Sequence, residues 1–194
     1  MTLKLYDAPT EEPITLAEAK LQGRVESSVT EDDALIASLI VAARSECEHL
    51  IGRALVTQVW ERVIDAFPQA EIELGMPPVQ SISKITYVDT AGATQTLIGS
   101  SYYVLDNVSD LEAFALPAVG YTWPATLDTA NAVRVRFTAG YGAASAVPDA
   151  IKAWLKIRVA TLYKFREQLI AGVSVADLPR GYVDALLDRY RIYA

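Results

Sequence analysis

The sequence predicts an α+β fold, in which a small helical bundle is split by a β-rich insertion between its second and third helices. Apolar residues recur at helical spacing over residues 31–51 and again over 148–167. Residues 54–146, between these two helices, are rich in β-branched and aromatic residues and carry turn signals. The chain has 194 residues, 52% of them hydrophobic, so one domain with a large insertion can bury a core without disulfides.

The first two helices are predicted near residues 15–22 and 31–51. Thr15 and Glu18 have the spacing of a capping box, and Gly23 ends the first helix. Thr30 can cap the second helix, and the three carboxylates that follow it suit the positive end of the helix dipole. Gly52 is placed to end this second helix.

From Ala54 onwards the helical spacing disappears. We expect strands at 54–64, 79–88, 94–98, 102–105 and 133–138, although apolar and polar residues alternate imperfectly in 79–88. Pro117, Gly120 and Pro124 predict that residues 112–127 hold no long regular element. The β-rich insertion is therefore predicted to span residues 54–146.

Two helices are predicted after the insertion, near 148–167 and 180–191. Pro148 suits the first turn of the earlier one, and a Gly-containing linker separates it from the last helix. Residues 1–53 and 147–194 are thus expected to form one discontinuous helical domain.

The formal net charge of −7 is unevenly distributed. Residues 1–80 carry −8, residues 81–146 carry −2, and residues 147–194 carry +3. With a sequence pI of about 4.8, tight nucleic-acid binding is disfavoured. Ends of opposite sign favour head-to-tail packing between copies or docking on a charged partner, and ordinary solvated helix faces are the alternative interpretation.

No motif predicts catalysis, a cofactor or a metal site. Cys47 is the single cysteine, so an internal disulfide is excluded, and it is expected to be a small buried hydrophobic residue within a helix. The single histidine, His49, is two residues away and therefore points to a different face of that helix. Gly140-Tyr141-Gly142 lacks the remaining glycine and the adjacent helix of a phosphate-binding loop. No apolar run is long enough for a membrane span, and the N-terminus does not resemble a signal peptide.

Four ordered segments resemble a known family. They are PITLAEAKLQGRVE (13–26) with EDDALIASLIVAARSECEHLIGRALVTQVW (31–60), LGMPPVQSISKITYVDTAG (74–92), VRFTAGYGAASAVPDAIKAWLKIRVATLYKFRE (135–167) and LPRGYVDALLDRYRI (178–192). The set resembles the head–tail connector proteins, also called adaptor or head-completion proteins, of long-tailed bacteriophages and gene-transfer agents. Ile51 departs from the threonine common at that position.

The resemblance implies a non-enzymatic protein of the virion neck, assembled in the host cytoplasm and without a cofactor. It implies a ring under the portal, commonly dodecameric, that extends the DNA channel without binding DNA specifically and meets a tail-side neck protein, a stopper or tail terminator. It allows a monomer before assembly and implies no membrane partner. Residues 168–194 become a docking segment, whose portal-contacting positions are Leu178, Pro179, Arg180, Tyr182, Leu186, Leu187, Arg189, Tyr190, Arg191 and Tyr193.

Charge adds one hypothesis to the resemblance. A channel that passes DNA should not grip it, so part of the acidic half is expected to face the bore and the basic last quarter the portal. Glu31, Asp32 and Asp33 are the candidate channel or inter-subunit positions.

Two alternatives stay open. One is a non-enzymatic binding module with a ligand or protein site on the β-rich insertion. The other is an enzyme that uses Glu71 and Glu73, which share one face of a predicted strand, as an acid pair.

Overall fold

The computed structural model describes residues 2–97, 99, 103–107, 111–165 and 183–192. The chain divides into two compact units. The helical unit comprises residues 11–55 and 143–194, and the sheet unit comprises residues 1–10 and 56–142. The predicted α+β class is confirmed, with three helices that pack together and two β-sheets.

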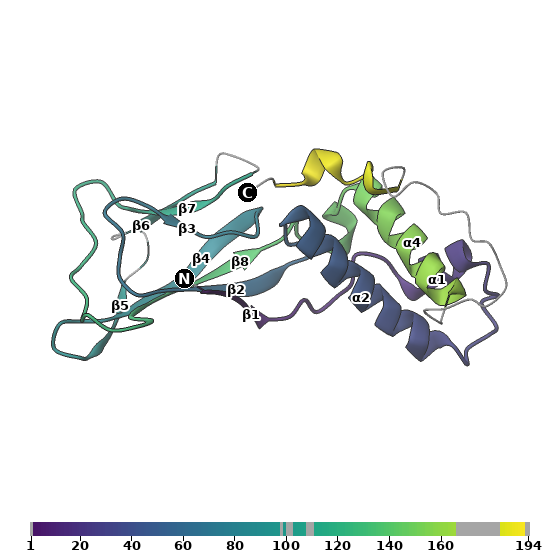
Figure 1. Ribbon diagram of the computed structural model, residues 1–194, viewed down its shortest axis with the longest axis horizontal. Coiled ribbons are helices and arrows are strands. Elements are labelled where there is room, and N and C mark those ends of the chain that lie inside the picture. Colours follow the sequence, from purple (N-terminus) through teal and green to yellow (C-terminus); the bar gives the residue numbers. More distant parts are fainter. Residues whose placement is uncertain (1, 98, 100–102, 108–110, 166–182, 193–194) are drawn as a thin grey trace. The chain divides into compact units, whose positions relative to one another are not determined.

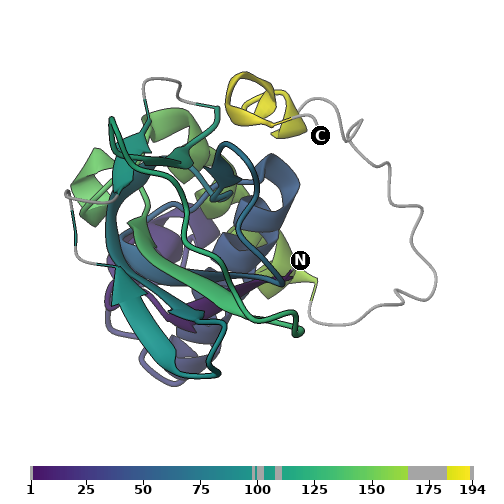
Figure 2. The same cartoon turned by 90° about the vertical axis from the view of Figure 1, so that its left-hand side faces the viewer.

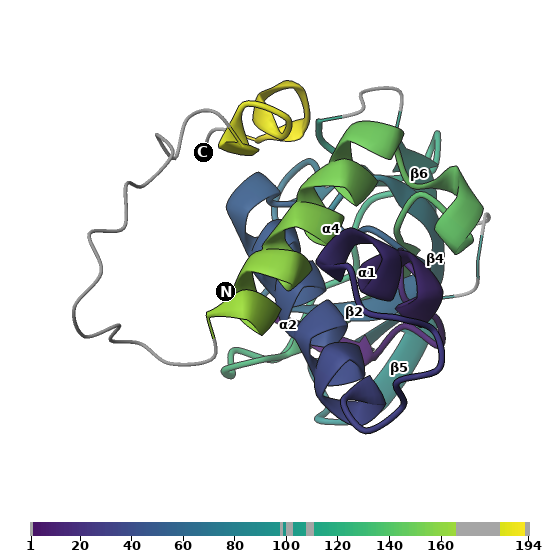
Figure 3. The ribbon, with the colours of Figure 1, turned by 90° about the vertical axis from the view of Figure 1, so that its right-hand side faces the viewer.

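The helical unit is built from α1 (Leu16–Gly23), α2 (Asp33–Ile51) and α4 (Asp149–Lys164), and α4 contacts both of the others (Figure 3). A short 3₁₀ helix, η1 (Ala144–Ala146), precedes α4. The capping box forms as predicted, because Thr15 and Glu18 exchange hydrogen bonds at the start of α1. Gly52 ends α2 in the left-handed conformation, at φ 71°.

The buried stripe of α2 is narrower than predicted and partly polar. Ile36, Ile40, Ala43, Cys47 and Ile51 are buried as expected, whereas Leu35, Leu39 and Leu50 are only half-buried. The same stripe carries two buried charged side chains, Arg44 and Glu48. On α4 the buried residues are Ile151, Trp154, Leu155 and Val159.

The sheet unit contains a five-stranded and a three-stranded antiparallel sheet (Figures 1 and 2). The larger has the order β1-β2-β8-β4-β5, with the bounds Thr2–Asp7, Gln58–Ile64, Val133–Ala139, Val79–Val88 and Thr94–Leu97. The smaller has the order β3-β7-β6, with the bounds Ile72–Glu73, Phe114–Pro117 and Tyr103–Asp106. Their facing sides form the core, from residues such as Phe137, Val135, Ile85, Ile72 and Ala115.

Two strands were not predicted. Residues 2–7, expected in the helical domain, form β1 and belong to the sheet unit because they pair with β2. Residues 114–117 form β7 inside the stretch expected to lack long elements. The imperfect alternation of 79–88 also has a structural cause, since the pairing of β4 with β8 shifts register twice, between Val79 and Ser81 and between Ile82 and Lys84.

The predicted last helix is only partly helical where it is described. Residues 183 and 184 are helical, a turn follows, and Asp188–Tyr190 form the 3₁₀ helix η2. Leu187 and Tyr190 donate their backbone N–H groups three residues back, which is the 3₁₀ pattern. The chain then becomes extended, because the N–H of Ile192 bonds to the carbonyl of Ile51. Residues 180–182 lie outside the described part.

Candidate functional site

The described part of the C-terminal segment, residues 183–192, is fastened to the helical unit. Arg53 Nε donates to the carbonyl of Tyr190 at 2.5 Å, and the N–H of Ile192 donates to Ile51 at 3.0 Å. Trp154 Nε1 on α4 donates to Asp184 Oδ1 at 2.9 Å. These contacts hold the segment against the end of α2 and against α4.

The docking residues implied by the resemblance differ in their exposure. Leu187 is fully buried, so it is part of the core of the helical unit and offers no surface to a partner. Arg189 is exposed, while Leu186, Tyr190 and Arg191 are half-buried. Arg189 is therefore the most accessible of the described docking positions. The remaining docking positions lie outside the described residues: Leu178, Pro179, Arg180, Tyr182 and Tyr193.

The candidate acidic positions at the start of α2 are mostly engaged within the helical unit. Asp33 pairs with the buried Lys20 of α1 at 2.5 Å, and Asp32 accepts a hydrogen bond from Tyr163 of α4 at 2.5 Å. Asp32 makes no side-chain cap, and the helix begins at Asp33 without the cap expected from Thr30. Glu31 is the exposed member of the three.

A second set of charges is buried inside the helical unit. Arg44 Nε lies 2.8 Å from Glu12, and its Nη1 lies 2.9 Å from Glu48. Glu48 also accepts the N–H of Leu55 at 2.9 Å. Every one of these bonds is internal, so the network ties the chain on either side of α2 to that helix.

Basic side chains surround one carboxylate on the outer face of the five-stranded sheet. Glu61 of β2 is only 3% exposed. Its carboxylate lies 2.8 Å from Lys4 of β1, and 3.0 Å and 3.5 Å from Arg136 and Arg134 of β8. The Arg136 guanidinium also lies over the Tyr6 ring, 3.4 Å from its centroid. We call Lys4, Lys84, Arg134 and Arg136 the basic face.

The basic face has more positive charge than Glu61 balances. Burial alone would raise the pKa of Glu61, but hydrogen bonds from Lys4 and Arg136 outweigh it and keep that pKa below its ordinary value. Lys84 of β4 is exposed and forms no ion pair with any residue in the described ranges. A hollow of about 110 Å³ lies among Glu61, Lys84, Thr86, Arg134 and Arg136. Its size and charge suit a small anionic group.

Local sequence patterns do not predict the basic face. Its members come from three strands that lie far apart in the sequence, and the pairing of Lys4 with Glu61 and of Glu61 with Arg136 brings them together. One signal was present, because Arg134 and Arg136 are two residues apart in an alternating strand and therefore share a face. Nothing in the local sequence shows that Lys4 joins them.

The other candidate positions are Cys47, the pair Glu71 and Glu73, and the glycines of residues 140–142. Cys47 is fully buried within α2, as predicted, and burial raises the pKa of its thiol to about 12. Glu71 and Glu73 are both exposed. Gly140 has φ 116°, and a Cβ atom there would lie 2.3 Å from the carbonyl oxygen of Val56. This close backbone approach explains the glycine without a phosphate.

The described part of the chain has neither a cluster of metal-ligating side chains nor a membrane-spanning helix. It contains no group of three or more histidine, cysteine, aspartate or glutamate side chains arranged to hold a metal ion. Within the same residues, no helix is both long and apolar enough to cross a membrane.

Comparison with known proteins identifies a shared fold. No protein-family model matches the sequence, and no curated protein matches it significantly. Three solved chains match all of this chain, each over 97% of its own length. One is from the neck of an empty gene transfer agent particle computed with C6 symmetry (23% identity, TM-score 0.81). Another is from the virion of a native gene transfer agent particle (25%, 0.79), and a third is from a native neck computed with C12 symmetry (20%, 0.71).

Proposed function

We propose that this chain is a structural protein of the neck of a phage-like particle. It forms a ring under the portal, extends the DNA channel and presents a surface to the tail or to the next neck protein. The full-length match to chains from gene transfer agent necks and virions carries this proposal, because both units of the chain are covered at a TM-score of 0.81.

The proposed ring is dodecameric. The two neck reconstructions that match were computed with C6 and C12 symmetry, and a twelve-membered ring contains both. Such a ring uses a heterologous interface, in which two different surfaces of each copy meet.

The proposed bore is acidic and does not grip DNA. The chain carries a net charge of −7, and strong neutralisation of phosphates would hold the duplex in place. Glu31 is the best-placed of the three candidate positions for the bore or an inter-subunit contact, because Asp32 and Asp33 are already bonded to Tyr163 and Lys20.

The proposed portal-docking element is the basic C-terminal segment. Its described part is anchored through the buried Leu187 and the bond from Arg53, which leaves the exposed Arg189 available to a partner. Arginine at an interface edge contributes both charge and directed hydrogen bonds.

Imaging and sedimentation of the purified chain, alone and mixed with the portal protein of the same particle, test this function. We expect rings on the portal, and at least about a tenfold loss of affinity when Arg180, Arg189 and Arg191 are all changed to Gln. The matched control changes Arg24, Lys152 and Lys164 to Gln, which removes the same charge from elsewhere in the helical unit. Absence of any complex with the portal would refute the proposed function. Unchanged affinity in the triple variant would refute the docking role alone.

A further inference from the structure

The sheet unit separates its charges onto two faces. It contains five basic and ten acidic residues, a net charge of −5. Four of the five basic residues nevertheless form the basic face on the outer side of the five-stranded sheet, around the single carboxylate of Glu61. A cluster of this sign in an acidic unit marks a surface for an anionic partner.

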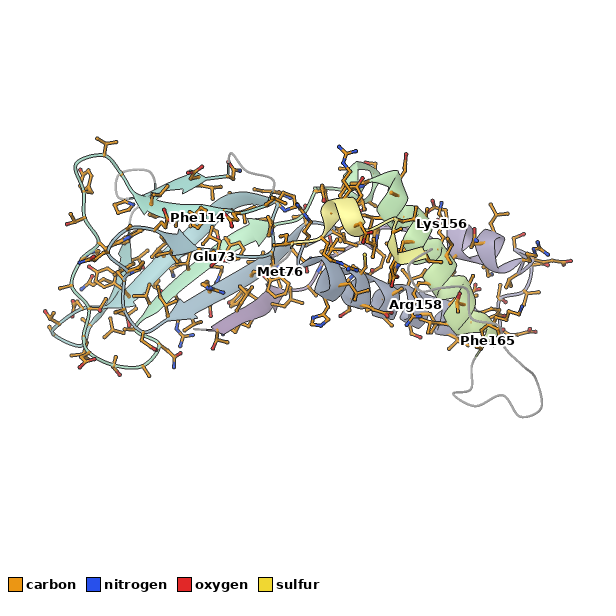
Figure 4. All side chains as sticks on the ribbon, turned by 45° about the horizontal axis from the view of Figure 1, so that its top comes forward. Glu73, Met76, Phe114, Lys156, Arg158 and Phe165 are labelled. Carbon is orange, nitrogen blue, oxygen red and sulfur yellow. The ribbon has the colours of Figure 1, made fainter. Side chains whose placement is uncertain are left out.

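The outer face of the three-stranded sheet is acidic. Glu73 of β3 and Asp106 of β6 both pair with Phe114 of β7, so these three side chains form one row on the same face. Glu73 and Asp106 are exposed, as are Glu71 and Glu112 nearby in sequence. Figure 4 shows Glu73 beside Phe114. We call Glu71, Glu73, Asp106 and Glu112 the acidic face.

The two faces point in opposite directions. Ile72, Ala115 and Tyr103 on the inner side of the small sheet are buried, as are Val135, Phe137 and Ile85 on the inner side of the large sheet. Since the inner sides form the shared core, the outer sides lie on opposite surfaces of the same unit. Opposite surfaces of complementary charge suit a head-to-tail ring, in which two different surfaces of each copy meet.

We infer that neighbouring copies of this chain bind one another through the sheet unit, with the basic face of one copy against the acidic face of the next. This inference rests on the proposed ring and names the surfaces that close it. A carboxylate of the neighbour enters the hollow beside Lys84 and Arg134, which Glu61 leaves with unbalanced positive charge. Tyr6, 46% exposed beside the basic face, and Phe114 on the acidic face add apolar contact.

The charge pattern favours a second copy over a nucleic acid. A duplex needs an extended run of phosphate contacts, whereas the basic face is one small patch with a carboxylate at its centre. A unit with a net charge of −5 would repel a polyanion beyond that patch. The acidic face supplies a partner of matching size and sign on the same molecule.

Two charge-reversal variants test the interface in the full chain. The first carries Lys84→Glu and Arg134→Glu, and the second carries Glu73→Lys and Asp106→Lys. Both leave Glu61, Lys4 and Arg136 unchanged, so the buried centre of the basic face is kept. Sedimentation is measured at low salt and about 1 mM protein, the effective concentration of neighbours tethered to one assembly.

We expect each variant alone to self-associate about a hundredfold more weakly than the natural sequence. An equal mixture of the two restores association, because every contact between alternating copies again joins opposite charges. A Lys152→Glu and Lys164→Glu variant, which changes the net charge by the same amount as the first variant but on the helical unit, should associate normally. High salt weakens association of the natural sequence.

Disulfide trapping provides a second measurement. A mixture of Lys84→Cys and Glu73→Cys chains should give crosslinked dimers, whereas a mixture of Lys152→Cys and Glu73→Cys should not. The native Cys47 is fully buried and does not interfere.

Several results would overturn the inference. The first is normal association of either charge-reversal variant, and the second is failure of their mixture to associate. The third is that the natural sequence does not self-associate and the mixture of Lys84→Cys and Glu73→Cys chains forms no crosslinks. Loss of duplex DNA binding in the Lys84→Glu, Arg134→Glu variant without loss of self-association would assign the basic face to nucleic acid instead. The proposed function fails separately, since it requires a complex with the portal.

Discussion

The two units of this chain use charged residues in opposite ways. In the helical unit, Arg44 and Lys20 are buried and bonded to carboxylates of the same unit. In the sheet unit, the carboxylate of Glu61 is buried while Lys84 and Arg134 remain exposed around it. The buried ion pairs of the first unit therefore fix how its helices pack, whereas the second unit has positive charge exposed at its surface.

This difference indicates where binding specificity resides. A buried ion pair whose bonds are complete offers little to a partner, and its removal costs stability. Exposed charges cost little to change and act on association rate and specificity. Variants of these buried ion pairs should therefore change folding, and variants of the exposed basic face should change assembly.

The largest expected effect falls on the sheet unit and involves no charge. In Gly140→Ala the new Cβ would lie 2.3 Å from the Val56 carbonyl oxygen, at a φ of 116°. Strain and overpacking together should lower the free energy of unfolding by about 3 to 4 kcal/mol. Urea unfolding, with hydrogen exchange to assign the loss to the sheet unit, measures this effect.

Gly92→Ala is the matched control for that variant. Gly92 also has a positive φ, 83°, but nothing lies within 4 Å of its added Cβ. Only the backbone cost remains, about 1 kcal/mol. Equal losses in the two variants would show that the contact with Val56 is not what requires glycine.

The elements that the sequence predicted well are those fixed by neighbours along the chain. The capping box of Thr15 and Glu18 and the stop at Gly52 depend on contacts within a few residues, so their pattern is visible locally. Strand β1 is short and almost entirely exposed, and only its pairing with β2, more than fifty residues away, makes it a strand. The shifts of β4 likewise depend on its partner β8.

The site was predicted less completely than the fold, for the same reason. The docking segment was found through resemblance, but Leu187 is a core residue because Arg53 and Trp154 bond its neighbours, and no local pattern reveals that. The basic face depends on strand order, which periodicity does not give.

Arg44→Met should show how much stability is lost when the cation of a buried ion-pair network is removed. The substitution leaves Glu48, 6% exposed, and the half-buried Glu12 without their cation, so the helical unit should lose about 3 kcal/mol. Chemical unfolding measures this loss. Under conditions where both proteins are folded, the variant should associate through the sheet unit as strongly as the natural sequence does.

Arg158→Met is the control for that substitution. Arg158 makes two 2.7 Å bonds to Glu46, but both side chains are more than a third exposed (Figure 4 labels Arg158 on α4). Water screens such a pair, so the expected loss is below about 1 kcal/mol. A loss equal to that of Arg44→Met would mean that burial does not separate the two pairs.

Glu61→Gln tests a carboxylate that combines both situations, because Glu61 is itself buried although the cations that it binds are partly exposed. The amide cannot balance Lys4 and Arg136, and water around Lys4, 48% exposed, moderates the cost to about 2 kcal/mol at neutral pH. The folded pKa of Glu61 is lowered, since hydrogen bonds from Lys4 and Arg136 outweigh the opposing effect of burial. Its stabilisation is therefore complete above the unfolded pKa of about 4.3 and is lost as the pH falls through the lower folded value. Unfolding measured from pH 7 to pH 3 should show the natural sequence losing its advantage over the variant below about pH 4, and a constant difference across that range would contradict the role of the ionised carboxylate.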